Sequence, residues 1–238
     1  MKYKIADFLI EVTDTKYKRM DYVAKDYIVE TGEPDVILSV DKADIEEEER
    51  LSEEDFREGV LYVTAAHRKI ADWLPNRDAF LMHSALFDVD GTGVAFAAHS
   101  GTGKTTHMSL WQKLLGERMT IVNGDKPIIR FFDGEKFPFA YGTPWNGKEG
   151  LGCNMKTPFK HICFIERSET NFVEKVEKSE VINRIFKQVY MPKDPIAVMK
   201  TMELVDRMLS TCNLWIIHCN MEDDAALVSY NAIFGNEK

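Results

Sequence analysis

The chain has 238 residues, of which 45% are hydrophobic, and it carries a formal net charge of −9. This length and apolar content can fill the core of one large α/β domain, or of a large domain with a smaller one. The acidic balance argues against nucleic acid or an anionic membrane as the main partner, because both select for basic surfaces. The four cysteines form no C-x-x-C pair, and neither a secretory signal nor an 18-residue apolar run is present. We therefore expect a cytoplasmic protein with reduced thiols.

Residues 1–76 are expected to form a small α+β part. Residues 3–12 and 35–40 are β-like runs separated by a charged middle and a Gly-Glu-Pro turn, which predicts a small sheet. Apolar residues then recur at alternating steps of four and three from Phe56 to Leu74, which predicts an amphipathic helix ended by Pro75. His67 lies on this stripe, so we interpret it as a packed core histidine rather than a ligand.

A hairpin is predicted where the apolar residues 79–89 and 93–98 flank Asp90-Gly91-Thr92-Gly93. The strand of residues 93–98 should therefore pair antiparallel with the strand before it. His83 falls within the first of these strands, where a hydrogen-bonded structural histidine is the alternative to a functional one.

The second hairpin strand leads into a stretch that is typical of a phosphate-binding loop, Ser100-Gly101-Thr102-Gly103-Lys104-Thr105-Thr106. Glycines take backbone angles that a side chain forbids, which lets successive N–H groups converge on phosphate oxygens at a helix N-terminus. We expect these seven residues to bind a nucleotide, Lys104 to reach its β- and γ-phosphates, and the Thr105 hydroxyl to bind Mg²⁺. The alternative is a glycine-rich turn before a helix.

A carboxylate follows the next predicted strand. Residues 104–115 have helical periodicity, residues 119–123 read as a buried strand, and Gly124-Asp125 comes directly after it. An acid in this position is where a second ligand of a phosphate site belongs, as in Walker B arrangements. A turn aspartate is the alternative.

The remainder of the chain predicts a hairpin, a glycine-rich loop and a regular C-terminal third. The hairpin joins residues 128–132 to 136–141, and residues 142–152 are interpreted as a mobile loop over the site, or else as a structural loop with an exposed tryptophan, Trp145. The loop offers Glu149 as an extra metal ligand and Lys148 as a cation for the transition state. Strands are then predicted at residues 161–166 and 214–218, and helices at 181–189, 196–209 and 223–234.

Three stretches together resemble the superfamily of HPr kinase/phosphorylase and ATP-dependent phosphoenolpyruvate carboxykinase. They are His83-Ser84-Ala85, the hairpin that enters Ser100 to Thr106, and Val122-Asn123-Gly124-Asp125, and the resemblance covers roughly residues 80–166. It implies an α/β nucleotide-binding domain over residues 77–238, in which a P-loop entered from an antiparallel hairpin stands in a mixed β-sheet with flanking helices. It also implies Mg-ATP, with Lys104 and the loop amides on the phosphates and Thr105 on Mg²⁺. Asp125 corresponds to the second acid of the family's Asp-Asp pair, and Gly124 stands at the position of the first.

The resemblance implies an ATP-dependent kinase that transfers the γ-phosphoryl group to a serine hydroxyl of a protein, a peptide or a small molecule. Asp125 could accept the proton of that hydroxyl or anchor Mg²⁺; in the second case His83 or Glu149 would take the proton. A non-catalytic ATP-binding regulatory module is the alternative, motivated by the missing acid at Gly124. Carboxykinase activity is disfavoured because the chain is too short for an oxaloacetate-binding domain, and assembly into a homo-oligomer is left open.

Overall fold

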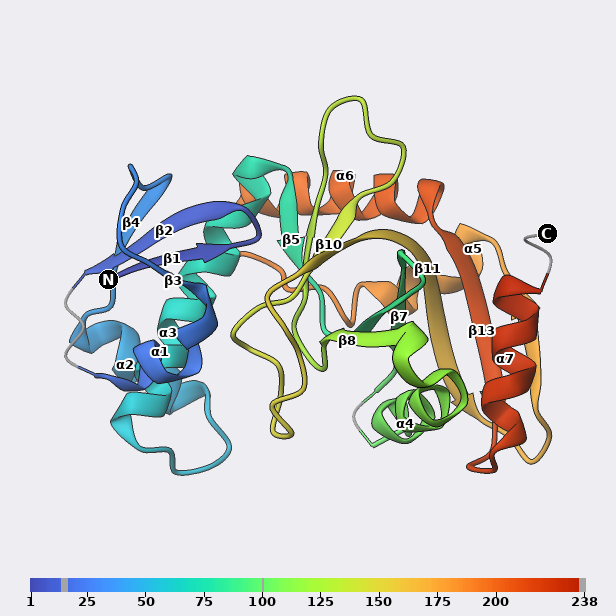
Figure 1. Ribbon diagram of the computed structural model, residues 1–238. Coiled ribbons are helices and arrows are strands. Elements are labelled where there is room, and N and C mark those ends of the chain that lie inside the picture. The colour runs from blue at the N-terminus through green and yellow to red at the C-terminus, as the bar shows by residue number, and fades with distance from the viewer. Residues whose placement is uncertain (14–16, 100, 236–238) are drawn as a thin grey trace.

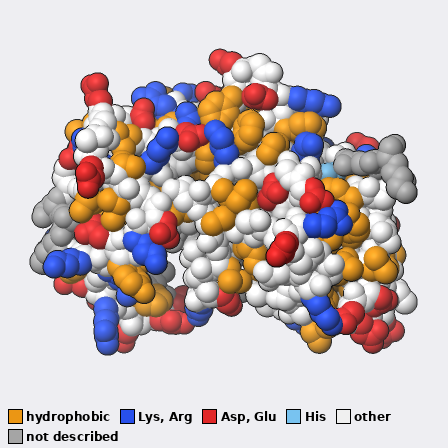
Figure 2. All heavy atoms as spheres, in the orientation of Figure 1, with side chains coloured by type: hydrophobic (Ala, Val, Ile, Leu, Met, Phe, Trp, Pro, Cys, Tyr) orange, Lys and Arg blue, Asp and Glu red, His pale blue; other side chains and the backbone are white. Residues whose placement is uncertain are grey.

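The computed structural model describes residues 1–13, 17–99 and 101–235, which form a mixed α/β architecture with two β-sheets (Figure 1). A four-stranded sheet in the order β3-β1-β2-β4 belongs to the N-terminal part, and a sheet of nine strands runs through the rest. Within the described ranges no helix is both long and apolar enough to cross a membrane. Figure 2 shows lysine and arginine side chains scattered among acidic and apolar ones on one face, so the described residues form no continuous basic surface there.

The small N-terminal sheet is present as predicted, but residues 3–12 form two strands rather than one. Its strands are β1 (Lys2–Ile5), β2 (Phe8–Thr13), β3 (Ile28–Val29) and β4 (Val36–Ser39). β1 and β2 pair antiparallel, and the turn between them places Ala6 and Asp7 at φ angles of 52° and 60°. A two-residue turn of this kind usually contains glycine or asparagine, so these residues gave no turn signal. The Asp7 carboxylate accepts a hydrogen bond from Tyr141 at 2.8 Å, which ties the turn to the larger part.

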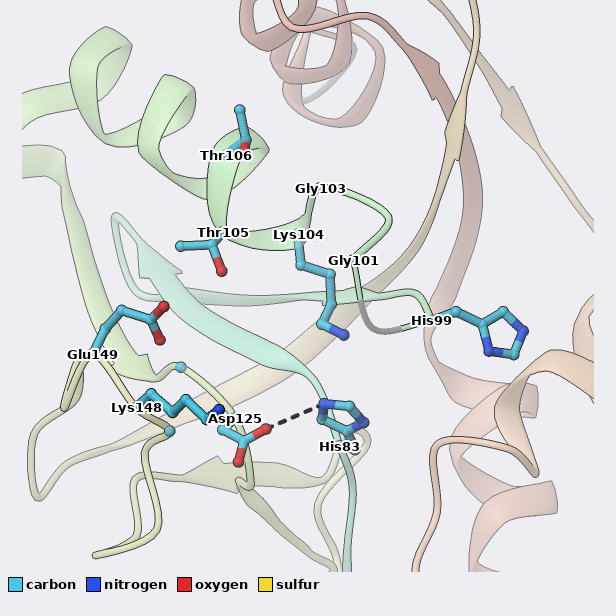
Figure 3. Close-up of a pocket in the computed structure, with 12 residues that line it drawn as sticks. His83, His99, Gly101, Gly103, Lys104, Thr105, Thr106, Asp125, Lys148 and Glu149 are labelled. Carbon is cyan, nitrogen blue, oxygen red and sulfur yellow. Dashed lines mark ion pairs between the residues drawn. The ribbon is translucent and has the colours of Figure 1, made fainter. Parts of the chain in front are cut away.

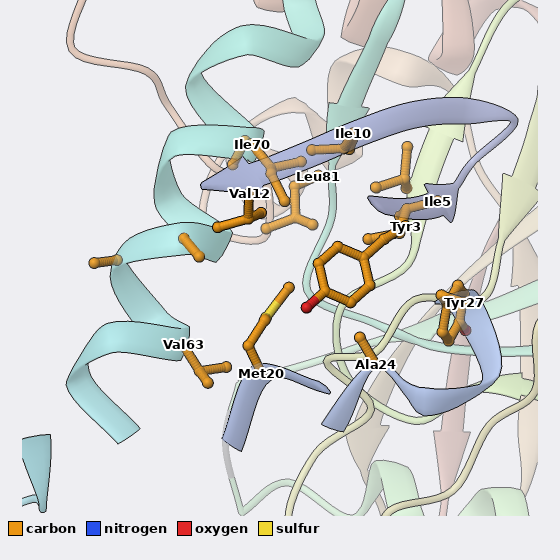
Figure 4. Close-up of a cluster of buried hydrophobic side chains, with 14 of the residues drawn as sticks. Tyr3, Ile5, Ile10, Val12, Met20, Ala24, Tyr27, Val63, Ile70 and Leu81 are labelled. Carbon is orange, nitrogen blue, oxygen red and sulfur yellow. The ribbon is translucent and has the colours of Figure 1, made fainter. Parts of the chain in front are cut away.

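Three helices accompany this sheet: α1 (Arg19–Val23), α2 (Lys42–Leu51) and α3 (Glu58–Trp73). The apolar stripe of α3 packs on the sheet, where Val63 and Ile70 join Tyr3 and Ile10 in one buried cluster (Figure 4). The same cluster includes Leu81, Ile128 and Tyr141 from the larger part. Residues 1–76 and 77–238 therefore share a core, and the boundary between them stays a prediction.

The larger sheet is mixed, as the hairpin before the phosphate-binding loop predicted. Its strands are β5 (Ala79–Leu81), β6 (Ala85–Val89), β7 (Thr92–Ala97), β8 (Met119–Asn123), β9 (Ile128–Arg130), β10 (Phe139–Tyr141), β11 (Lys156–Arg167), β12 (Phe172–Lys175) and β13 (Asn213–Cys219). β7 pairs antiparallel with β6 and parallel with β11, which in turn pairs parallel with β13. Short 3₁₀ helices cover Lys25–Tyr27, Leu74–Arg77 and Gly116–Arg118.

Residues 79–89 were expected to be one strand, and the structure divides them at His83. β5 pairs with β9, whereas β6 pairs with β7 and β8. The chain changes partners between the two strands, where the backbone N–H of His83 donates to the Gln188 carbonyl at 2.6 Å. His83 is therefore not a strand residue but lies in the connection between β5 and β6.

Helices cover both faces of the larger sheet: α4 (Lys104–Leu115) and α7 (Asp224–Phe234) on one, and α5 (Lys178–Ile185) and α6 (Pro195–Thr211) on the other. Successive residues of β7 alternate between these layers. Phe96 packs with Trp111 of α4, whereas Ala95 and Ala97 pack in the cluster that contains α5 and α6. A strand buried on both faces needs apolar residues at every position, which explains the unbroken apolar run before the phosphate-binding loop.

Candidate functional site

The phosphate-binding loop connects β7 to α4, as the sequence predicts. Gly101 and Gly103 have φ angles of 77° and 120°, which L-residues with a side chain rarely adopt. No atom lies within 4 Å of a Cβ built at either glycine, so the backbone angle and not a lack of space requires glycine here. Lys104 is the first residue of α4, so the helix N-terminus opens directly from the loop. Ser100 lies outside the described residues, and its predicted role as a ligand stays a prediction.

A cavity of about 460 Å³ stands in front of this loop and brings most of the predicted site residues together (Figure 3). It is lined by His83, His99, Gly101, Gly103, Lys104, Thr105, Thr106, Gly124, Asp125, Gly147, Lys148 and Glu149. Thr102 lines two neighbouring cavities instead. The cavity thus joins four separate segments of the chain: the break before β6, the loop before α4 with the start of that helix, the turn after β8, and residues 147–149.

Lys104 lies half-buried at the start of α4, and its ammonium group is held by its own loop. Nζ donates to the carbonyl oxygen of Ala98 at 2.7 Å. Burial lowers the pKa of Lys104; the Asp125 carboxylate opposes this shift and the Lys126 ammonium adds to it. A cation that is partly desolvated and lies beside the loop amides is well suited to bind a phosphate group.

Asp125 is held by a partner on each carboxylate oxygen. Oδ1 lies 3.1 Å from His83 Nε2, and Oδ2 lies 2.5 Å from the Nζ of Lys126. Burial alone would raise the pKa of Asp125, but the hydrogen bonds from His83 and Lys126 outweigh burial and lower the pKa well below its usual range. Asp125 is therefore ionised at neutral pH, and His83 Nε2 donates a hydrogen bond to it. Lys126 was missed from the sequence, where only its position next to the acid could have drawn notice.

The direction of Asp125 is set by a fully buried asparagine at the end of β8. Asn123 Oδ1 accepts hydrogen bonds from the backbone N–H groups of Asp125 and Lys126 at 2.9 and 2.6 Å, which makes an Asx-type turn. The amide nitrogen of Asn123 donates to the Oγ1 and backbone oxygen of Thr143 at 3.0 and 3.2 Å. Neither Asn123 nor Thr143 stood out in the sequence as a residue that positions the acid.

Gly124 has no room for a side chain. A Cβ at this position would lie 3.0 Å from the carbonyl oxygen of Asn146 and 3.2 Å from that of Leu151. The N–H of Gly124 donates to the same Leu151 oxygen at 2.9 Å. A side chain at position 124 would therefore press on the backbone of residues 142–152.

Residues 142–152 are hydrogen-bonded to the end of β8 and the turn after it, and Trp145 is half-buried where an exposed ring was expected. Its ring stacks on His67 with the ring centroids 4.2 Å apart, and it packs against the N-terminal core. His67 is buried, which confirms its interpretation as a core histidine, and desolvation lowers its pKa to about 3. Only the tip of the segment, Gly147 to Glu149, lines the cavity. Movement of this tip stays a prediction.

The oxygen donors near the loop fit Mg²⁺. Thr105, Asp125 and Glu149 all line the cavity and offer hydroxyl and carboxylate oxygens, the ligand class this ion prefers. Among the described residues no three His, Cys, Asp or Glu side chains are grouped so as to hold an ion by themselves. This arrangement suits an ion that takes one or two protein ligands and completes its shell with phosphate oxygens and water.

Comparison with known proteins gives a distant likeness only. No protein-family model matches the chain, and no curated protein matches it. Among solved structures, the chain is similar to the Hpr(Ser) kinase/phosphatase from Coxiella burnetii, with a TM-score of 0.30 and 10% sequence identity. The alignment covers 52% of this chain and 86% of that one. So weak a likeness supports no conclusion about activity.

Proposed function

We propose that the chain is a Mg-ATP-dependent phosphotransferase of the HPr kinase-like type, which transfers a phosphoryl group to a serine hydroxyl of a protein, a peptide or a small molecule. The proposal is supported by one observation: the same cavity is lined by Lys104 at the N-terminus of α4 and by the hydrogen-bonded pair of His83 and Asp125. Phosphoryl transfer requires positioning and charge neutralisation more than covalent chemistry. Lys104, the helix N-terminus and the His83–Asp125 pair would supply both positioning and charge neutralisation within this cavity.

In this proposal the phosphates lie along the loop amides and the ammonium group of Lys104. Mg²⁺ would be held by Thr105 and Asp125, with Glu149 as an additional ligand, and it would neutralise charge on the phosphate oxygens. Lys148 lines the same cavity and would contribute a second protein cation to the charge that develops on the transferred group.

The geometry favours His83 over Asp125 as the group that takes the proton of the acceptor hydroxyl. An acid whose pKa is depressed by His83 and Lys126 is a weak base near neutral pH. His83 Nε2 donates a hydrogen bond to Asp125, so Nδ1 is the ring nitrogen that is available to the acceptor hydroxyl. Asp125 then orients the imidazole and anchors the metal, which is the second of the two roles that the sequence left open.

Removal of the loop cation tests nucleotide binding directly. Lys104→Ala should weaken ATP binding much more than AMP binding, because AMP lacks the β- and γ-phosphates that the ammonium group faces. Titration calorimetry with both nucleotides measures this difference, with Lys113→Ala, at an exposed position later in α4, as the matched control. Equal losses of affinity for ATP and AMP would overturn the assignment of the phosphate-binding loop.

The two halves of the His83–Asp125 pair should respond differently. Asp125→Asn should weaken Mg²⁺ and ATP binding together, whereas His83→Gln should leave ATP affinity nearly unchanged and slow transfer by about 10² to 10⁴. Magnesium titrations and single-turnover transfer assays separate these effects. An unchanged magnesium midpoint in Asp125→Asn would show that Asp125 is not a metal ligand.

A non-catalytic ATP-binding regulatory module is the second candidate. It is favoured by the space at Gly124, which admits no second acid, and by the ion pair that Lys126 makes with the remaining one. Turnover measured against a panel of hydroxyl acceptors distinguishes the two functions. ATP binding without transfer or hydrolysis would favour the module.

A further inference from the structure

A second cavity of about 400 Å³ lies beside the phosphate-binding loop. It shares Gly101, Gly103 and Thr106 with the first cavity, so the loop and the first turn of α4 separate the two. Its other walls come from the ends of the parallel strands β11 and β13 and from the chain that follows β13. Ligands of open α/β sheets commonly bind in the crevice outside the carboxyl ends of the parallel strands, and that is where this cavity stands.

We propose that this second cavity is the nucleoside site, in which the base and ribose of the nucleotide lie while its polyphosphate runs across the loop into the first cavity. The assignment rests on the proposed function, because it presupposes that the loop binds a nucleotide. Its volume falls within the range of about 300–1,000 Å³ that is usual for small-molecule sites.

The charges on either side of the loop fix the direction of the nucleotide. The first cavity contains the ionised Asp125 with His83, and the charged residues Lys104, Lys148 and Glu149, which suit the reactive phosphate end. Among the described residues that line the second cavity, Arg167 is the one charged side chain. Ile165 and Cys219 supply buried apolar wall, as the neutral faces of a base and a sugar require.

Arg167 is already engaged with the loop. Its Nε donates to the Thr102 carbonyl at 3.3 Å, and its terminal nitrogen donates to the carbonyl of Gly101. The guanidinium group therefore holds the loop against the end of β11. It does not leave an isolated cation that would turn this cavity into a second anion site.

His107 contributes a buried, uncharged ring to the wall of the second cavity. Ser229 Oγ donates to the Ala225 carbonyl at 2.8 Å and accepts from Trp111 Nε1 at 2.8 Å, so its contact with His107 Nε2 at 3.1 Å requires the imidazole to donate. The His107 proton is therefore on Nε2, and burial lowers the pKa of the ring to about 4, which keeps it neutral. Nδ1 is left as a buried acceptor with no partner within the described residues. The neutral ring of His107 suits an uncharged base or sugar in this cavity better than a phosphate group.

A third cavity, of about 490 Å³, is less suitable for the nucleoside. Its walls contain the ion pair between Arg184 and Glu166, which a neutral base would have to desolvate. It meets the loop at Thr102 but does not touch Gly101, Gly103 or Thr106, along which the phosphates would lie. The second cavity, in contrast, shares Gly101, Gly103 and Thr106 with the first.

Titrations of the whole chain with Mg-ATP and with magnesium tripolyphosphate test the assignment, because tripolyphosphate has the phosphates without the nucleoside. The wild-type protein should bind ATP more tightly than tripolyphosphate. Ser168 lines the second cavity from a half-buried position, and Ser168→Trp should fill it. We expect this change to weaken ATP binding by about tenfold or more and to leave tripolyphosphate affinity within about twofold. Met221→Ala, which removes an exposed apolar side chain from the rim, should weaken ATP binding alone by about threefold.

The matched control is Ser210→Trp, at an exposed position of α6 far from the loop in the sequence, which should change neither affinity. Wild-type ATP affinity in both Ser168→Trp and Met221→Ala, or equal wild-type affinity for ATP and tripolyphosphate, would overturn the nucleoside site and leave the phosphate-binding loop in place. A wild-type protein that binds neither compound would overturn the proposed function itself.

Discussion

Gly124 stands at a tightly packed position beside Asp125. The carbonyl oxygens of Asn146 and Leu151 stand 3.0 and 3.2 Å from the position of a Cβ there, so the missing acid follows from the path of the neighbouring backbone. Backbone gives way less easily than the end of a flexible side chain. An acid placed at this position would have to displace the segment that lines the cavity.

We therefore expect Gly124→Asp to destabilise the protein and not to enhance transfer. Overpacking of this kind costs about 1–3 kcal/mol in the free energy of unfolding, which urea denaturation measures. Gly59→Asp is the matched control, because a Cβ at Gly59 meets nothing nearer than 3.7 Å. Faster transfer by a fully stable Gly124→Asp protein would show that the segment yields readily and that the second acid is compatible with the site.

At the scale of elements, residues 142–152 support the turn after β8 through hydrogen bonds, and we call this segment the brace. Thr143 is buried, and its Oγ1 accepts from Asn123 at 3.0 Å and donates to the Lys126 carbonyl at 2.8 Å. The segment thereby reaches Asp125 indirectly, through the asparagine that orders the turn. A substitution at Thr143 should therefore change the orientation of the Asp125 carboxylate, although Thr143 does not contact Asp125.

Thr143→Val tests this coupling. Valine keeps the shape but removes the hydroxyl, which leaves buried polar groups with fewer partners and should cost about 1–3 kcal/mol of stability. If the turn then loosens, magnesium binding should weaken even though every proposed ligand is intact. The same substitution at Thr170, an exposed residue, serves as the control. Unchanged magnesium affinity in a destabilised Thr143→Val protein would show that the turn holds Asp125 without the brace.

The sequence was sufficient to predict those elements that depend on residue types close together in the chain. The β6–β7 hairpin has Asp90 and Gly91 at positive φ, and the loop glycines do as well, so residue type alone indicated both. The break at His83 was missed because it arises from a change of strand partners, which apolar content does not record. Lys126, Asn123 and Thr143 escaped notice for the same reason, since their roles depend on contacts between segments distant in the sequence. The position of Trp145 likewise depends on His67, a residue of the N-terminal part.

For the molecule as a whole, three buried histidines make stability depend on pH. Burial lowers the pKa of His67 to about 3 and those of His107 and His161 to about 4, whereas an unfolded histidine titrates near 6.5. Between these values the unfolded chain binds more protons than the folded one, so the free energy of unfolding falls as the pH falls below about 6.5. Above that pH this contribution to stability is fully present.

We expect each of these histidines to lower the free energy of unfolding by on the order of 1 kcal/mol between pH 7.0 and 5.5. Urea denaturation at the two pH values measures the total. His67→Phe keeps an aromatic ring against Trp145 and removes one titrating group, so it should reduce the pH dependence by roughly a third. The same slope in both proteins would mean that His67 keeps an ordinary pKa in the folded state.

β7, the strand that leads into the phosphate-binding loop, should pair with β6 and with β11 at different stages of folding. β6 is joined to β7 by a two-residue turn and can pair with it within microseconds, as short hairpins do. On the other side of β7, Val94 pairs with His161 of β11, which in turn pairs with Asn213 of β13. These pairings join residues far apart in the sequence, so they form more slowly than the hairpin. A nascent or truncated chain that ends before β13 would contain every residue of the loop yet lack the wall that β13 supplies. If the proposed site is correct, nucleotide binding should therefore require β13 to be in place. Binding would then indicate a completely folded chain, and the presence of the loop residues alone would not be sufficient for it.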